Sequence, residues 1–206
     1  MTALARSAPG FPLKRAILAV FAALSLASCG INSVPTADEQ VKAQWGNLQA
    51  EYQRRADLVP NLVATVKGYA QQEKTVLTDV TNARAKATSV QLNAGDLSDP
   101  AKVQAFQAAQ SQLSGSLGRL LVSVEAYPDL KSNQNFLALQ DQLEGTENRI
   151  EIARRDYNSA VQQYNTLIRT FPTAIGAKVF YGDKPKVPFE AAANAQTAPT
   201  VNFNAS

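Results

Sequence analysis

The sequence of 206 residues contains no histidine, one cysteine and one methionine. Without histidine, the chain has no Ser-His-Asp triad, no zinc site of Cys and His ligands and no haem held by histidine. A single cysteine forms no intramolecular disulfide. The P-loop, the G-x-S-x-G elbow and the dinucleotide fingerprint are missing too. We therefore expect a protein that is not an enzyme and needs no cofactor.

The chain also lacks a large excess of charge of either sign. The formal net charge is +3, and residues 1–28 carry three cations and no acid, so the remaining 17 Lys and Arg balance 17 Asp and Glu. Nucleic-acid binding requires a surplus of cations on one surface, so we expect no nucleic-acid partner. The hydrophobic content of 45% and the charged content of 18% are those of a folded globular chain.

The N-terminal region has the pattern of an export signal. An apolar run of about 11 residues, 16–26, follows the three cations, which is too short for the ~20 residues of a spanning helix and matches a secretory signal. It ends in Leu26-Ala-Ser-Cys29-Gly30, which resembles the bacterial lipobox. We predict a lipoprotein signal peptide over 1–28, then a lipidated Cys29 and a short linker over 29–35. The alternative is a buried cysteine after an ordinary signal peptide or an anchoring helix.

A lipidated Cys29 makes the membrane the first partner of the chain. Two or three acyl chains hold a protein on a bilayer far better than one does. The folded part is then expected outside the cytoplasm, on the periplasmic side. In a cell with two membranes, Gly30 after the cysteine favours the inner leaflet of the outer membrane over the inner membrane, where an aspartate is the usual retention signal.

The rest of the chain is patterned as long helices. Apolar or small residues recur with alternating spacings of four and three over 41–90, 103–127 and 136–171, and no stretch shows the alternation of a half-buried strand. The main polar exceptions on this seam are Arg55, Glu73, Gln110 and Thr146. The pattern predicts an all-α fold, an elongated antiparallel bundle over 36–172 with an irregular to disordered tail over 173–206.

Breaks in the pattern set the expected helix boundaries. Thr36 to Glu39 reads as a capping box, Ser98-Asp99-Pro100 as a helix start, and Ser132 or Asn133 as the cap of the last helix, which Pro172 ends. Pro60 is expected to bend or split the first run. The bundle then has three long helices, or four if Pro60 forms a corner.

Three ordered blocks within the helical region are more specific than generic helix. They are Tyr52-Gln-Arg-Arg-Ala-Asp-Leu-Val-Pro-Asn-Leu-Val63, Glu125-Ala-Tyr-Pro-Asp-Leu-Lys131 and Gln142-Leu-Glu-Gly-Thr-Glu-Asn-Arg-Ile150. Together they resemble the LemA family of bacterial envelope proteins, from about Trp45 to Phe171. The resemblance implies a tethered helical bundle outside the cytoplasmic membrane, with no established enzymatic activity. A lipobox in place of a spanning helix departs from many relatives.

The polar residues of these blocks are the candidate site. They are Arg54, Arg55, Asp57, Pro60, Asn61, Glu144, Gly145, Thr146, Glu147, Asn148 and Arg149. Their charges form either a recognition patch or ligand clamp, or an ion network between helices that fixes register. The second interpretation is favoured because Arg55 and Thr146 fall on the seam, where a polar residue sets register.

One pair of carboxylates allows a different chemistry. Glu144 and Glu147 lie three residues apart on one helical face, as acid–base or hard-cation chemistry requires, but no third carboxylate completes a site. The sequence therefore favours a membrane-tethered, non-catalytic scaffold that binds an unidentified envelope protein. A metal-binding, small-ligand or hydrolytic role for Glu144 and Glu147 is the alternative.

Overall fold

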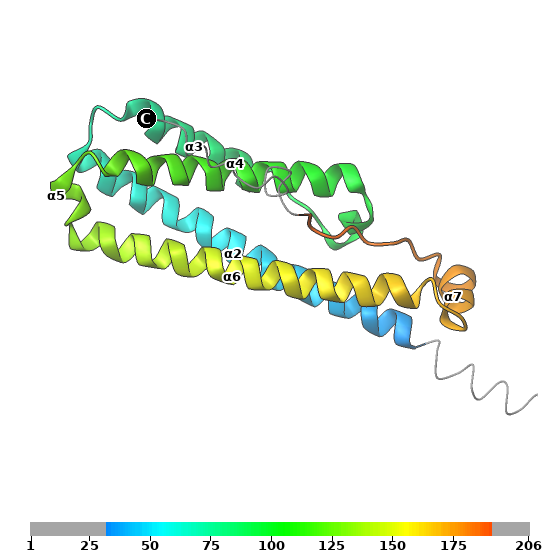
Figure 1. Ribbon diagram of the computed structural model, residues 1–206. Coiled ribbons are helices and arrows are strands. Elements are labelled where there is room, and N and C mark those ends of the chain that lie inside the picture. The colour runs from blue at the N-terminus through cyan, green and yellow to red at the C-terminus, as the bar shows by residue number, and fades with distance from the viewer. Residues whose placement is uncertain (1–31, 191–206) are drawn as a thin grey trace, which may run out of the picture.

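The computed structural model describes residues 32–190 and consists of helices joined by short connections (Figure 1). The long helices are α2 (Ser33–Tyr69), α3 (Lys74–Ser89), α4 (Pro100–Val124) and α6 (Gln134–Leu167). They run up, down, up and down along one long axis. A 3₁₀ turn (Ala94–Ser98) and the short α5 (Pro128–Lys131) connect them. The expected all-α antiparallel bundle is confirmed.

The seam positions form the core of the bundle. Val41, Leu48, Val59, Leu113 and Ile150 are all under 5% exposed. The core has two clusters: one surrounds Trp45 towards the start of α2, and the other surrounds Leu62 towards its end. Two expected seam residues lie outside the core, because Tyr69 is 49% and Phe171 is 82% exposed. Tyr69 is the last residue of α2, and Phe171 lies beyond the end of α6.

The chain does not bend back at Pro60, which lies inside the continuous helix α2. Of the two alternatives, a bend or a split, the split does not occur, and the bundle has four long helices because the chain reverses at another place. Proline in a helix interior costs about 3 kcal/mol, but Val59, Leu62 and Val66 are buried on both sides of it and hold the helix together. The reversal falls instead at residues 70–73, where Ala70 is buried. This turn contains neither glycine nor proline, so it left no signal in the sequence.

Helix starts are partly as expected. Asp99 caps α4, because its carboxylate accepts hydrogen bonds from the backbone of Ala101 and Lys102, and Asn133 caps α6. The capping box at Thr36 is wrong. Helix α2 begins three residues earlier, and the Thr36 hydroxyl donates to the Asn32 carbonyl 2.8 Å away, inside the first turn.

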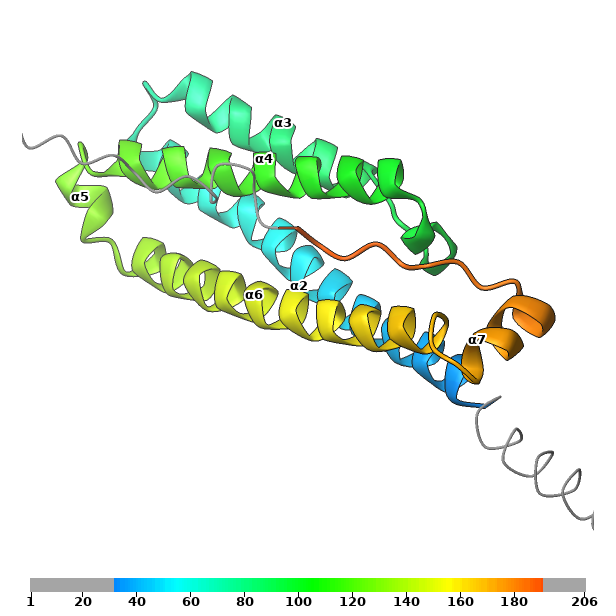
Figure 2. The ribbon, with the colours of Figure 1, turned by 45° about the vertical axis from the view of Figure 1, so that its right-hand side comes forward.

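The segment after α6 is more ordered than the sequence indicated. Helix α6 ends at Leu167, before the expected Pro172, and α7 (Thr173–Gly176) continues into a π-helical turn (Ala177–Tyr181). Gly182, at φ +61°, ends that turn in the left-handed conformation that glycine tolerates best. Residues 183–190, which we call the C-terminal strap, then run back along the bundle (Figure 2).

Several expectations for the ends of the chain lie outside the described residues. These are the signal peptide over 1–28, the lipidated Cys29 and the tail over 191–206. Among residues 32–190, no helix combines the length and the apolar character needed to cross a membrane.

Candidate functional site

Arg55 lies in the interior of the bundle, although it carries a full charge. It stands on α2 among the seam residues and is 1% exposed. Its Nη1 donates to Oε1 of Glu147 on α6, at 2.9 Å, and to the hydroxyl of Ser114 on α4. Its Nη2 donates to the Gln110 side-chain oxygen at 2.7 Å and to the Gln110 carbonyl at 3.1 Å. The guanidinium thus joins α2 to both α4 and α6.

Gln110 extends this network to the fourth long helix. Its side-chain nitrogen donates to the carbonyl of Ala87 on α3 at 3.2 Å, while its side-chain oxygen accepts from Arg55. The Arg55 network, defined here as Arg55, Gln110, Ser114 and Glu147, therefore contacts all four long helices. Because buried polar groups need partners, each member fixes the position of the others.

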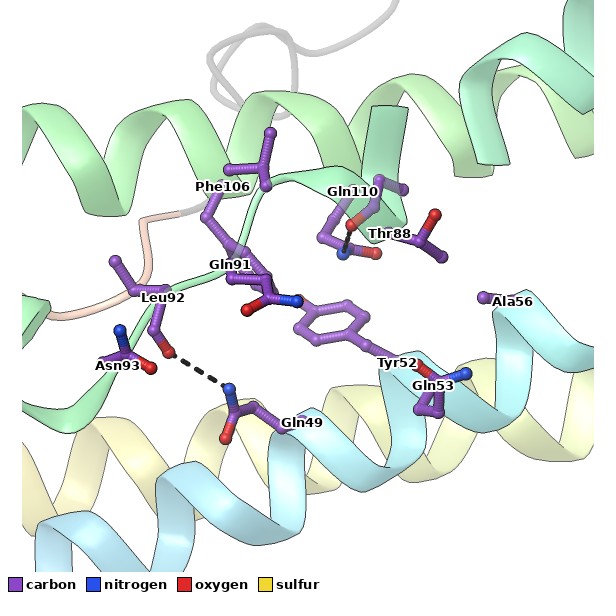
Figure 3. A pocket seen from close by; sticks show the side chains of 12 residues that line it. Gln49, Tyr52, Gln53, Ala56, Thr88, Gln91, Leu92, Asn93, Phe106 and Gln110 are labelled. Carbon is purple, nitrogen blue, oxygen red and sulfur yellow. Dashed lines mark hydrogen bonds between the residues drawn. The ribbon is translucent and has the colours of Figure 1, made fainter. Parts of the chain in front are cut away.

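Side chains of α2 also hold the connection between α3 and α4 in place. The Leu92 carbonyl accepts hydrogen bonds from Trp45 Nε1 and Gln49 Nε2, both at 3.1 Å. Figure 3 shows Gln49 reaching this carbonyl across a small pocket of about 210 Å³, with the ring of Tyr52 beneath Gln110. The pocket is bordered mainly by amides and apolar atoms and by no acidic residue.

A groove of about 840 Å³ opens beside the Arg55 network. Helix α4 contributes Gln104, Gln107 and Ser111, α6 contributes Glu147 and Arg154, and the strap also lines it. The polar groups that α4 contributes to this groove are neutral amides and hydroxyls, and its charged residues come from the other elements: Arg55, Glu147, Arg154 and Glu190. Such a surface suits hydrogen bonding to a peptide backbone or to neutral polar side chains.

Other residues of the family blocks line a second groove, between α2 and α6. It measures about 540 Å³ and is bordered by Arg54, Gly145, Thr146 and Arg149. Both arginines pair with Glu51, at 3.8 Å and 3.1 Å. These side chains are about half exposed, so the ion pairs contribute little stability each.

The two carboxylates of the alternative hypothesis are engaged separately. Glu147 is committed to Arg55, whereas Glu144 is exposed and accepts a hydrogen bond from Gln140 at 3.0 Å. Over residues 32–190, no cluster of three or more His, Cys, Asp or Glu could hold a metal ion. No observation in this region favours a metal or hydrolytic site at this pair.

The remaining block residues lie at the surface. Asp57, Pro60, Asn61 and Asn148 are exposed, and Asp57 accepts a hydrogen bond from Gln53 at 2.8 Å. Thr146 is buried, and its hydroxyl donates to the Gln142 carbonyl one turn back. The blocks thus divide into a buried network and an exposed face.

The C-terminal strap is held by two asparagines of α6. Asn158 bonds to both the N–H and the carbonyl of Phe189, and Asn165 does the same with Lys186, all at 2.8 Å. Phe189 is 4% exposed and stacks on Trp45 with ring centroids 6.0 Å apart. The strap is therefore part of the core.

Burial shifts the acidity of tyrosines around this aromatic cluster. Desolvation raises the pKa of Tyr157 and of Tyr164 well above the ordinary value, and it raises the pKa of Tyr52 as well. At the start of α2, burial works to raise the pKa of Asp38, but hydrogen bonds and charge from Lys42 and Lys186 outweigh it, so that this pKa is lowered.

Sequence reasoning located Arg55, Gln110 and Thr146 as polar residues on the seam but did not join Gln110 and Ser114 to Arg55. Three polar seam positions on three helices were the available signal, because a buried charge needs partners at its own level of the bundle. The two strap asparagines left no such signal, since their partners are backbone groups of a segment without periodicity.

Known proteins place the chain in a family. The model of the LemA family matches residues 44–203. Magnetosome protein MamQ 2 of Paramagnetospirillum magneticum is 27% identical over 172 residues, covering 76% of this chain and 63% of the relative. Protein LemA of Metamycoplasma hominis is 28% identical over 126 residues, covering 61% of this chain and 53% of the relative. The chain thus spans less than two thirds of the length of these relatives. It belongs to the LemA family.

Proposed function

We propose that this chain is a membrane-tethered, non-catalytic scaffold of the cell envelope that binds another envelope protein. The observation that carries the proposal is the Arg55 network. The buried guanidinium of the family blocks is hydrogen-bonded to side chains of neighbouring helices, and the network contacts all four long helices. Such a network supports a rigid bundle. The bundle then acts through its surfaces.

The tether of this proposal is the lipid on Cys29. It is supported by the position of the chain's single cysteine at the end of a short apolar run with small residues before it. Membrane fractionation together with the intact mass of the mature protein tests it. Cleavage before Cys29 and the added mass of two or three acyl chains are expected; a mature protein without added lipid mass contradicts the tether.

The groove between α4 and α6 is the proposed docking face for the partner. The neutral side chains of Gln104, Gln107 and Ser111 offer hydrogen-bond donors and acceptors beside the Arg55 network. They suit an extended segment of another envelope protein with little net charge, because the two arginines and two glutamates that also line the groove balance one another. The chemistry of the groove alone defines the partner.

Site-specific photo-crosslinking in living cells tests the docking face. A photoreactive residue at Gln104, which is exposed in the groove, is expected to trap one discrete protein that mass spectrometry identifies. The same residue at Asn82, exposed on α3, is the matched control. The bulky variant Ser111→Trp should abolish the product. A product that forms equally from Asn82, or survives Ser111→Trp, overturns the docking face.

A further inference from the structure

The end of the bundle formed by α7 and the π-helical turn carries several exposed large apolar side chains, which are called its apolar face below. Phe171, Ile175 and Val179 recur every four residues and are 82%, 57% and 69% exposed, and Tyr181 beside them is 46% exposed. The opposite side of the same turns is buried at Gly176 and Ala177. The other large apolar residues exposed among residues 32–190 are scattered over three helices, α2, α4 and α6: Tyr69, Val122, Leu137 and Ile152. A gathered apolar face of this kind marks an interaction site.

Three cations accompany this apolar face in the sequence. Arg169, Lys178 and Lys184 are exposed, and none of them forms an ion pair within residues 32–190. The one acid between residues 169 and 184 is Asp183, which is partly buried near Tyr164. Apolar side chains flanked by Lys and Arg are the composition of surfaces that lie in the interface of an anionic bilayer.

This face lies at the same end of the molecule as the start of α2. Ala177 packs in one core cluster with Val34, and Lys186 pairs with Asp38 at 3.0 Å. Figures 1 and 2 both show α7 beside the first turn of α2. Helix α2 begins at Ser33, four residues after Cys29, and four extended residues span at most about 14 Å. A lipid on Cys29 therefore brings this end of the bundle to the membrane.

We propose that this end cap, defined as Phe171, Ile175, Val179 and Tyr181 with the flanking Arg169, Lys178 and Lys184, inserts into the interface of a bilayer that carries anionic lipid. It forms a second contact beside the tether and fixes the long axis of the bundle relative to the membrane. The inference rests on the proposed function for the position of the tether. The apolar face and its cations are features of the fold alone.

Tryptophan quenching in vesicles tests the end cap. The full chain, purified with its native N-terminal processing, is reconstituted in vesicles of phosphatidylethanolamine with about 30% phosphatidylglycerol and brominated acyl chains. Ile175→Trp is compared with Val122→Trp, a matched exposed apolar position at the end of α4, at the other end of the bundle. The native Trp45 is buried and serves as an internal reference in both variants.

Quenching of the Ile175→Trp emission by half or more, with Val122→Trp unaffected, is the expected result. Val179→Trp should behave like Ile175→Trp, which guards against a local distortion by one substitution. Lys178→Glu with Lys184→Glu should lower the affinity of the end cap for the anionic surface at least tenfold, since each cation near such a surface contributes about fivefold. In vesicles of phosphatidylcholine alone, the quenching should weaken to a similar degree.

Two outcomes overturn the inference. Emission from Ile175→Trp that is no more quenched than that from Val122→Trp shows that the face does not reach lipid. A blue-shifted Ile175→Trp emission without vesicles, together with a dimer in solution, shows that a second copy covers the face. Intact mass of the same sample reports the lipid on Cys29 separately, so that failure of the tether and failure of the end cap are distinguished.

Discussion

The substitution Arg55→Met tests whether the buried guanidinium stabilises the bundle. Methionine keeps an unbranched apolar stem in a site that is 1% exposed but removes every donor of the network. The Gln110 side-chain oxygen then loses its 2.7 Å charged donor in the core, which costs about 1–3 kcal/mol. Glu147, whose side chain is 41% exposed, is released into water at little cost. We expect the free energy of unfolding to fall by about 3 kcal/mol.

Urea unfolding followed by far-ultraviolet circular dichroism measures this change. The neighbouring substitution Arg54→Met is the matched control, because the Arg54 side chain is 60% exposed and pairs with Glu51 at 3.8 Å; it should stay within about 0.5 kcal/mol of the parent. Adding Gln110→Leu to Arg55→Met should recover most of the loss, since both buried partners are then apolar. Equal effects of Arg55→Met and Arg54→Met would refute the structural role.

Three further predictions concern the strap and the titrating groups. Phe189 is buried, so Phe189→Ala should lower the free energy of unfolding by about 3–4 kcal/mol. Phe171 is 82% exposed, so Phe171→Ala should change the stability of the protein in solution by under about 0.5 kcal/mol in the same urea assay. The raised pKa of Tyr157 means that its effect on stability is absent below pH ~10 and that stability is lost as the pH rises further. The part of the tyrosinate absorbance that Tyr157→Phe removes should appear together with the loss of helical dichroism, and its appearance before that loss would contradict burial. The lowered pKa of Asp38 means that its contribution to the free energy of unfolding is present above pH ~4 and is lost as the pH falls. Asp38→Asn should therefore flatten the acid side of a plot of stability against pH. An unchanged acid side would contradict the pairing of Asp38 with Lys186.

The periodicity of the sequence predicted the core, because apolar residues spaced three and four apart lie on one face of a helix and that face packs inward. Val41, Trp45, Leu113 and Ile150 were all identified by spacing alone and are all buried. The same pattern does not encode where a chain reverses. The turn after Tyr69 uses Ala70 to Glu73, which have no turn-forming residue, so it was missed.

Pro60 is the opposite case, in which the sequence contains a turn signal where the chain does not reverse. A proline inside a helix is a strong local signal, but its cost is small beside the burial of the apolar side chains around it. Local chemistry could place Arg55 on the seam, but only the packing of four helices could bring Gln110 and Ser114 to it. The strap could not be found from periodicity, because Phe189 is held by rings and asparagine side chains rather than by a helix.

The most direct test of the central claim is a double-mutant cycle between Arg55 and Glu147, read by urea unfolding. Arg55→Met is combined with Glu147→Gln and, in a matched second cycle, with Glu144→Gln, an exposed residue three positions earlier on α6. If the Arg55 network holds the helices together, the coupling free energy of Arg55 should be about 1–2 kcal/mol with Glu147 and about zero with Glu144. Equal coupling in the two cycles, or none in either, would contradict it.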